Sequence, residues 1–185
     1  MGEHKVICAG FGGQGVMSMG RLLAYTGMLK GLEVSWLPSY GPEMRGGTAN
    51  CNVIISETPI GSPIITRDAT AVIAMNLPSM RKFEVELVEN GLLVLNRSLI
   101  SVDGERHDIR SVPVAANEEA SGLGSGKAAN MVMLGSFLAL TNLFTVDEVA
   151  DALQKVFGPR KVDLLPLNRA ALERGYELAA HPVAG

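Results

Sequence analysis

A glycine-rich segment is the first part of the chain whose composition suggests ligand chemistry. Residues 10–15 read Gly-Phe-Gly-Gly-Gln-Gly and fit the pattern G-x-G-x-x-G. They follow a short apolar run at residues 6–9 and precede helix-spaced apolar residues at 16–30, so the pattern predicts a strand, a glycine loop and a helix. The backbone N–H groups of such a loop can face an anion at the helix N-terminus. The candidate contacts here are Gly10, Gly12, Gly13, Gln14 and Gly15.

Two familiar nucleotide sites share this pattern but fit poorly. A dinucleotide site also needs an acid at the end of the second strand, whereas that strand, at residues 33–37, carries its only acid at its beginning, Glu33. No Lys-Ser or Lys-Thr pair follows the glycines, which disfavours a nucleoside triphosphate site. The remaining alternative is that the glycines only allow the strand and the helix to pack closely.

The second unusual segment is residues 38–47, which contain two prolines and three glycines. This composition predicts a shaped surface loop. Its arginine offers a planar cation for a carboxylate or a phosphate, and its tyrosine an apolar wall. An ion pair between Arg45 and Glu43 that stiffens the loop is an equal alternative. The candidate contacts are Ser39, Tyr40, Glu43, Arg45, Gly46 and Gly47.

Other reactive residues give little sign of a catalytic centre or a metal site. Cys8 and Cys51 lie in apolar runs and are expected to be buried free thiols. No Cys-x-x-Cys pair is present, so the chain is not expected to bind an iron–sulfur cluster by itself. The three histidines, His4, His107 and His181, are too far apart in sequence to suggest a metal site. We therefore assign no catalytic residue and no metal ligand.

The elements that would position these loops alternate between strand and helix. Further strands are predicted at 48–56, 69–75, 91–96 and, more weakly, 109–114, with residues 48–56 and 62–65 as a possible antiparallel pair. Helices are predicted from Asn76 to about residue 89 and over 115–121, 127–140, 145–157 and 164–180. Asn130, at the start of a very apolar helix, is a further candidate contact or a structural cap, and Met131 and Met133 are expected in the core. The sequence predicts one α/β domain over residues 1–185, with a mixed or mostly parallel sheet, covering helices and a helical C-terminal third.

The composition and net charge of the chain limit the kinds of partner that it is expected to bind. The chain has 185 residues, 47% of them hydrophobic, and a net charge of −3, so nucleic acid is an unexpected partner. The first residues show no secretion signal and no apolar run has transmembrane length, so a cytoplasmic protein without a membrane partner is expected.

Two blocks together resemble one protein family. Gly-Phe-Gly-Gly-Gln-Gly-Val at 10–16 and Pro-Ser-Tyr-Gly-Pro-Glu-Met-Arg-Gly-Gly-Thr-Ala-Asn at 38–50 are similar to the gamma subunit of 2-oxoacid:ferredoxin oxidoreductases. The resemblance continues through residues 53–56, 60–63 and 129–135, so it covers most of the chain. The second block looks most like members that act on 2-oxoglutarate or branched-chain 2-oxoacids, and of these we favour 2-oxoglutarate.

The resemblance implies coenzyme-A-dependent oxidative decarboxylation of a 2-oxoacid. It implies that the complex uses thiamine diphosphate, Mg²⁺, [4Fe–4S] clusters and coenzyme A, none of them bound by this chain alone. The implied partners are alpha and beta subunits, a possible ferredoxin-like delta subunit, and ferredoxin. The isolated chain could also form a homodimer. The alternatives are an indolepyruvate oxidoreductase subunit, a scaffold without ligand contacts, and a stand-alone dinucleotide-binding protein.

Overall fold

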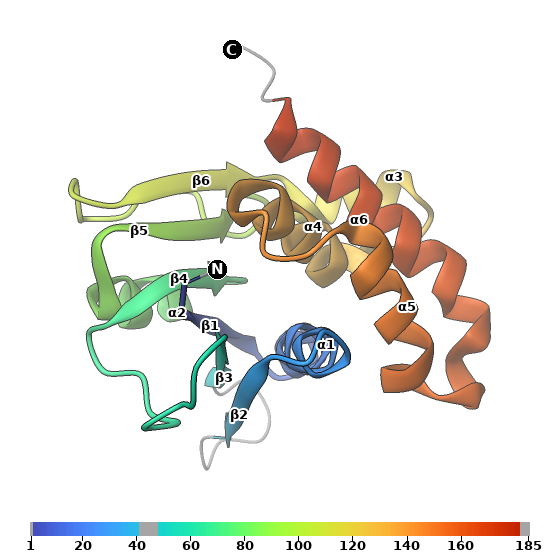
Figure 1. Ribbon diagram of the computed structural model, residues 1–185. Helices are drawn as coiled ribbons and strands as arrows, with labels where there is room; N and C mark the ends of the chain where they lie inside the picture. The colour runs from blue at the N-terminus through green and yellow to red at the C-terminus, as the bar shows by residue number, and fades with distance from the viewer. Residues whose placement is uncertain (1, 41–47, 182–185) are drawn as a thin grey trace.

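A computed structural model gives the structure of the chain and describes residues 2–40 and 48–181. Four predicted contact residues, Glu43, Arg45, Gly46 and Gly47, lie outside the described residues. The described part forms an α/β fold with one sheet (Figure 1).

The sheet has six strands in the order β2-β3-β1-β4-β5-β6. Strand β3 is antiparallel to both of its neighbours, while β4, β5 and β6 continue parallel to β1. The sheet is therefore mixed, as the sequence predicted. The sequence did not predict that β3 runs against the other strands. The strands are β1 (His4–Phe11), β2 (Glu33–Tyr40), β3 (Thr48–Ser56), β4 (Ala69–Ala74), β5 (Leu87–Asn96) and β6 (Arg110–Val114).

Two local predictions were wrong. Residues 62–65 form no strand, because β3 already has both of its edges paired, with β1 and β2. The helix predicted from Asn76 to about residue 89 ends at Phe83, followed by a short 3-10 turn, and β5 begins at Leu87. Leu87 pairs with Ala69 of β4, so sheet pairing overrides the helical pattern there.

Helices cover the two faces of the sheet unequally. One core cluster joins one face to α1, α3, α4, α5 and α6, and a smaller cluster joins the other face to α2 and two long loops. Figure 1 shows the C-terminal helices gathered beyond the sheet, which confirms the predicted helical C-terminal third. The helices are α1 (Val16–Leu29), α2 (Leu77–Phe83), α3 (Ala116–Gly122), α4 (Ala129–Thr141), α5 (Val146–Phe157) and α6 (Leu165–Ala180), with short 3-10 turns at Glu84–Glu86, Gly126–Ala128 and Pro159–Leu164.

Helix α4 is the central helix of the larger core. Met131 and Met133 are fully buried, which confirms their predicted place in the core. Helix α6 packs on α4, and the buried Ser136 hydroxyl of α4 donates a hydrogen bond of 2.9 Å to the carbonyl oxygen of Gly175 in α6. A side chain at that glycine would meet the backbone of α4, so the two helices approach closely.

The two cysteines lie opposite each other on β1 and β3, are free thiols, and are completely buried. A hydrogen bond to Cys51, together with burial, raises the pKa of Cys8. The prediction of buried free cysteines is confirmed.

We expect neither thiol to react with a maleimide in the native chain, because an alkylating reagent needs an accessible thiolate. Both should react in guanidinium chloride. Mass spectrometry after short incubations would measure this, and rapid native labelling at Cys8 or Cys51 would contradict the buried placement.

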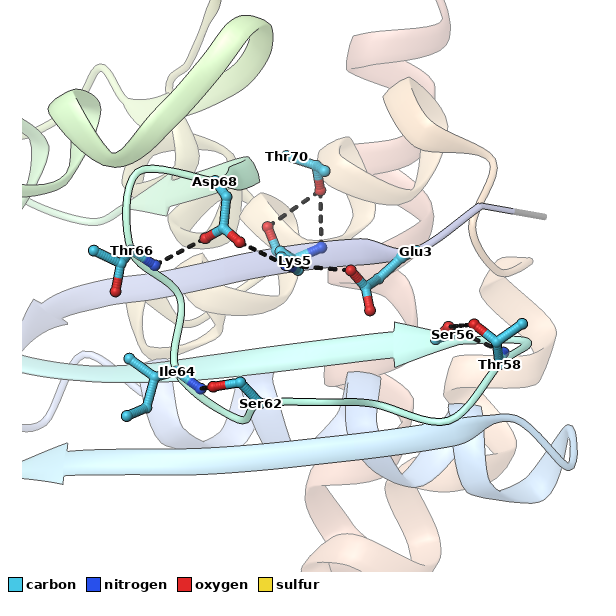
Figure 2. Close-up of polar contacts among 9 residues, drawn as sticks. All are labelled: Glu3, Lys5, Ser56, Thr58, Ser62, Ile64, Thr66, Asp68 and Thr70. Carbon is cyan, nitrogen blue, oxygen red and sulfur yellow. Dashed lines mark hydrogen bonds and ion pairs between the residues drawn. The ribbon is translucent and has the colours of Figure 1, made fainter.

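The long loop between β3 and β4 is fixed to the start of β1 by polar contacts (Figure 2). The Lys5 ammonium forms an ion pair of 2.5 Å with Asp68, whose other carboxylate oxygen accepts a hydrogen bond from the backbone N–H of Thr66. The hydrogen bond from Lys5 lowers the pKa of Asp68 below its usual value. These contacts hold the end of the loop against the sheet.

Replacing Asp68 with asparagine should lower the free energy of unfolding at pH 7 by about 0.5–1 kcal/mol, since the ion pair is partly exposed. A carboxyl group whose pKa falls on folding stabilises above its unfolded pKa, and this stabilisation is lost as the pH drops through the folded pKa. The difference between wild type and variant should therefore shrink at acidic pH. Urea unfolding at several pH values would measure it, and a difference that stays constant down to acidic pH would contradict this role.

Candidate functional site

The glycine loop lies at the carboxyl edge of the sheet. It begins at the end of β1, where Phe11 pairs with Thr48, the first residue of β3. Next to them Tyr40, the last residue of β2, pairs with Ala49. The glycine loop, Tyr40 and Thr48 therefore lie along one edge, the edge where α/β proteins usually bind ligands.

Side chains from the neighbouring turn hold the glycine loop in shape. The Gln14 side-chain oxygen accepts hydrogen bonds from the backbone N–H of Phe11, at 2.6 Å, and from the Asn76 side chain, at 3.0 Å. Asn76 also caps α2 by accepting a bond of 2.9 Å from the backbone N–H of Ser79. The loop after β1 and the turn after β4 are thus joined through one amide. Within the described residues, Gln14 therefore has a structural role.

A second contact joins the loop to the start of α4. The buried Asn130 side chain donates a hydrogen bond of 3.2 Å to the carbonyl oxygen of Gly15. Gly15 precedes α1 with a φ of 77°, and a Cβ atom there would lie 2.3 Å from the Asn130 side-chain nitrogen. Only glycine fits this conformation and this contact. Asn130 thus reaches this edge of the sheet, where it supports the backbone of the glycine loop.

The outer part of the loop remains open to a ligand. Gly12 and Gly13 are exposed, and a Cβ atom at Gly13 would meet no atom of the described residues within 4 Å. Helix α1 has no side-chain cap and no acid in its first turn, so its N-terminal dipole is not neutralised locally. This arrangement can attract an anionic group or a carbonyl oxygen through backbone N–H groups.

Two further asparagines, Asn76 and Asn96, extend this polar edge. The sequence did not indicate either of them as a site residue. The buried Asn96, at the end of β5, donates hydrogen bonds to the carbonyl oxygen of Met75, at 3.4 Å, and to the side chain of Asn117, at 2.8 Å. Asn96 ends an apolar strand run and Asn76 directly follows another. An asparagine at the carboxyl end of two strands is the sequence signal that could have indicated them.

The other predicted contacts are less closely connected to the loop. Ser39 is exposed near the end of β2 and pairs with Asn50 of β3. His4 lies at the opposite end of β1 from the loop, and burial lowers its pKa. Within residues 2–40 and 48–181, no group of three or more His, Cys, Asp or Glu side chains is placed to bind a metal ion. In the same ranges no helix is long and apolar enough to span a membrane.

The fold and this edge define a class: an α/β domain whose glycine loop is held in place at the carboxyl edge of a mixed sheet. The sequence model for pyruvate ferredoxin/flavodoxin oxidoreductase matches residues 5–178. The chain therefore belongs to this oxidoreductase family.

Individual relatives agree with the family assignment. The chain is 38% identical to the ketoisovalerate oxidoreductase subunit VorA of Methanothermobacter thermautotrophicus, over 99% of this chain but only 38% of that protein's length. It is 28% identical to the 2-oxoglutarate synthase subunit KorC of Methanocaldococcus jannaschii, over 96% of this chain and 94% of that one. The solved gamma subunit of a keto/oxoacid ferredoxin oxidoreductase from Geobacter sulfurreducens superposes with a TM-score of 0.81 at 26% identity, covering 95% and 98% of the two chains.

Proposed function

We propose that the chain is the gamma subunit of a multi-subunit 2-oxoacid:ferredoxin oxidoreductase, which decarboxylates a 2-oxoacid oxidatively and forms an acyl-coenzyme A. The observation that carries the proposal is the match of almost the whole chain, residues 5–178, to the family model. The likeness to a gamma subunit of similar length supports the same role. The alpha and beta subunits, a possible delta subunit and ferredoxin are the proposed partners, and the proposed location is the cytoplasm.

In this proposal the chain contributes a binding surface at the carboxyl edge of its sheet, and the partner subunits contribute the redox chemistry. Thiamine diphosphate with Mg²⁺ and [4Fe–4S] clusters would supply decarboxylation and electron transfer from the partner subunits. The braced glycine loop would present backbone N–H groups toward the substrate, the coenzyme A or a partner. Arg45, on the adjoining segment, would add a cation for a carboxylate or phosphate.

The sequence motifs favoured 2-oxoglutarate, but the proposed substrate is now a branched-chain 2-oxoacid, with 2-oxoglutarate as the second candidate. The higher identity to VorA, 38% against 28% for KorC, favours the first. The match to KorC over nearly the full length of both chains supports the second. A relative named indolepyruvate oxidoreductase subunit IorB, from Archaeoglobus fulgidus, is also 28% identical, so indolepyruvate belongs in any substrate panel.

The test is co-purification of the tagged chain from its source cells, followed by an assay of ferredoxin reduction with coenzyme A and a panel of 2-oxoacids. Larger subunits should co-purify, and one of the three acids should give the highest activity. Recovery of the chain alone, with bound nicotinamide or flavin, would contradict the proposal.

Replacing Arg45 with alanine should lower turnover of the reconstituted complex about tenfold, the size expected for one lost charge-assisted hydrogen bond. The melting temperature of the isolated chain should not change. Arg81→Ala, at an exposed position of α2, is the matched control and should leave turnover unchanged. A lower melting temperature with normal turnover would instead assign Arg45 to the Glu43 ion pair.

A further inference from the structure

A cavity of about 270 Å³ lies on the sheet face that faces away from α1. Its floor is formed by β1, β3 and β2, and its walls by the end of α2, the turn after it and the long loop before β4. Figure 2 shows this loop crossing the face of the sheet. The cavity thus lies on the opposite side of the sheet from the larger core cluster.

Two asparagines stand on the floor of this cavity. Asn50 and Asn52 alternate along β3 with Cys51 and Val53, which belong to the core on the α1 side, so the asparagines point the opposite way. Asn50 is only 9% exposed, yet among the described residues its side chain has no hydrogen-bond partner. Its polar atoms are not among the fully buried, unpartnered side-chain atoms of the described residues, so the carboxamide reaches the cavity and can bind a polar group of a ligand there.

The walls add one charge of each sign. Lys82 is exposed at the rim, its ammonium lies 5.1 Å from the centre of the Phe83 ring, and it forms no ion pair with the described part of the chain. Glu86 uses one carboxylate oxygen to accept a hydrogen bond of 2.7 Å from the backbone N–H of Arg67, which leaves its other oxygen available. The described lining residues carry one positive and one negative charge, which disfavours a phosphate or a dicarboxylate.

The rest of the lining is apolar and small. The buried Ile7, Ile65 and Phe83 and the half-exposed Leu37 surround the polar groups. A short branched aliphatic group fits such a surface, and the hydrophobic effect favours its burial there.

We propose that this cavity binds a small α-amino acid with an apolar side chain, in its zwitterionic form. Lys82 and the two asparagine side chains receive the carboxylate, Glu86 receives the ammonium group, and the apolar residues receive the side chain. No bond is made or broken, so the site is one for binding. Binding by the isolated chain requires no partner subunit, so this inference can fail or succeed independently of the proposed oxidoreductase role.

The first test is calorimetric titration of the full chain with three probes of matched carbon skeleton. Valine carries both charges, 3-methyl-2-oxobutanoate lacks the ammonium group, and isobutylamine lacks the carboxylate. Valine should bind at least about tenfold more tightly than either, because each charge-assisted contact is worth that much. Equal affinity for the oxoacid, or no binding of valine, would overturn the proposal.

Variants test the named contacts. Lys82→Met and Glu86→Gln should each weaken valine binding about tenfold, and the glutamine can still accept the bond from Arg67. Arg81→Met and Glu89→Gln change exposed neighbours that do not line the cavity and should bind valine as the wild type does. In the wild type, NMR should show the side-chain amide signals of Asn50 and Asn52 shifting with valine. Amide signals that do not move, or an equal loss in both control variants, would place binding elsewhere.

Discussion

Replacing Gly175 with alanine is expected to lower the free energy of unfolding by about 3 kcal/mol or more, the largest effect expected of any substitution discussed above. A Cβ atom at this position would lie 1.9 Å from the carbonyl oxygen of Val132 in α4. That contact is with backbone, so no side-chain rotation can relieve it, and α6 would have to move away from α4. The same movement would break the hydrogen bond from Ser136 to the Gly175 carbonyl oxygen.

Urea unfolding followed by circular dichroism would measure the effect of Gly175→Ala. Gly122→Ala is the matched control, because this glycine also lies in a helix but a Cβ atom there would meet nothing within 4 Å. Alanine at 122 should be neutral or slightly stabilising, since it has the higher helix propensity. If the two variants unfolded alike, the close packing of α4 against α6 would be wrong.

Gly15→Ala should destabilise the chain by about 2 kcal/mol, because it combines a left-handed backbone with a clash. The clash is with the Asn130 side chain, so it can be separated from the backbone strain by a double-mutant cycle. In an Asn130→Ala background the same substitution should cost only about 1 kcal/mol, the strain that remains. The coupling energy reports the contact between the loop and α4.

Gly13→Ala is the control for that cycle. Gly13 also has a positive φ, 94°, but open space where a Cβ atom would lie, so its cost should be the same with or without Asn130. Chemical unfolding of the single and double variants measures the free-energy cost of each substitution in each background. Equal costs of Gly15→Ala in both backgrounds would show that Asn130 does not brace the loop.

The local patterns of the sequence were sufficient for the class of fold and for most elements. The strand before the glycines, the helix after them and the helix predicted over 145–157 all formed as predicted, because these signals depend on near neighbours. The last of these helices begins with a capping box between Thr145 and Glu148. The two motif blocks were sufficient for the family, since residues 5–178 match its model. The helix end at Phe83 was missed because sheet pairing at Leu87 decided it.

The contacts among distant residues were decided only by the tertiary structure. The sequence marked Asn130 as a candidate contact or cap, but neither its bond to Gly15 nor the approach of Gly175 to Val132 follows from the sequence, because these pairs meet only when segments far apart in the chain pack together. The place of β3 between β1 and β2 likewise depends on strand pairing over long separations. The sequence by itself determined which segments are strands, helices and glycine loop, through local periodicity and turn chemistry. Packing of those segments decided that Gln14 and Asn130 hold the glycine loop in place and that this loop lies beside the last residue of β2 and the first residue of β3. It also decided that a polar cavity remains on the sheet face away from α1.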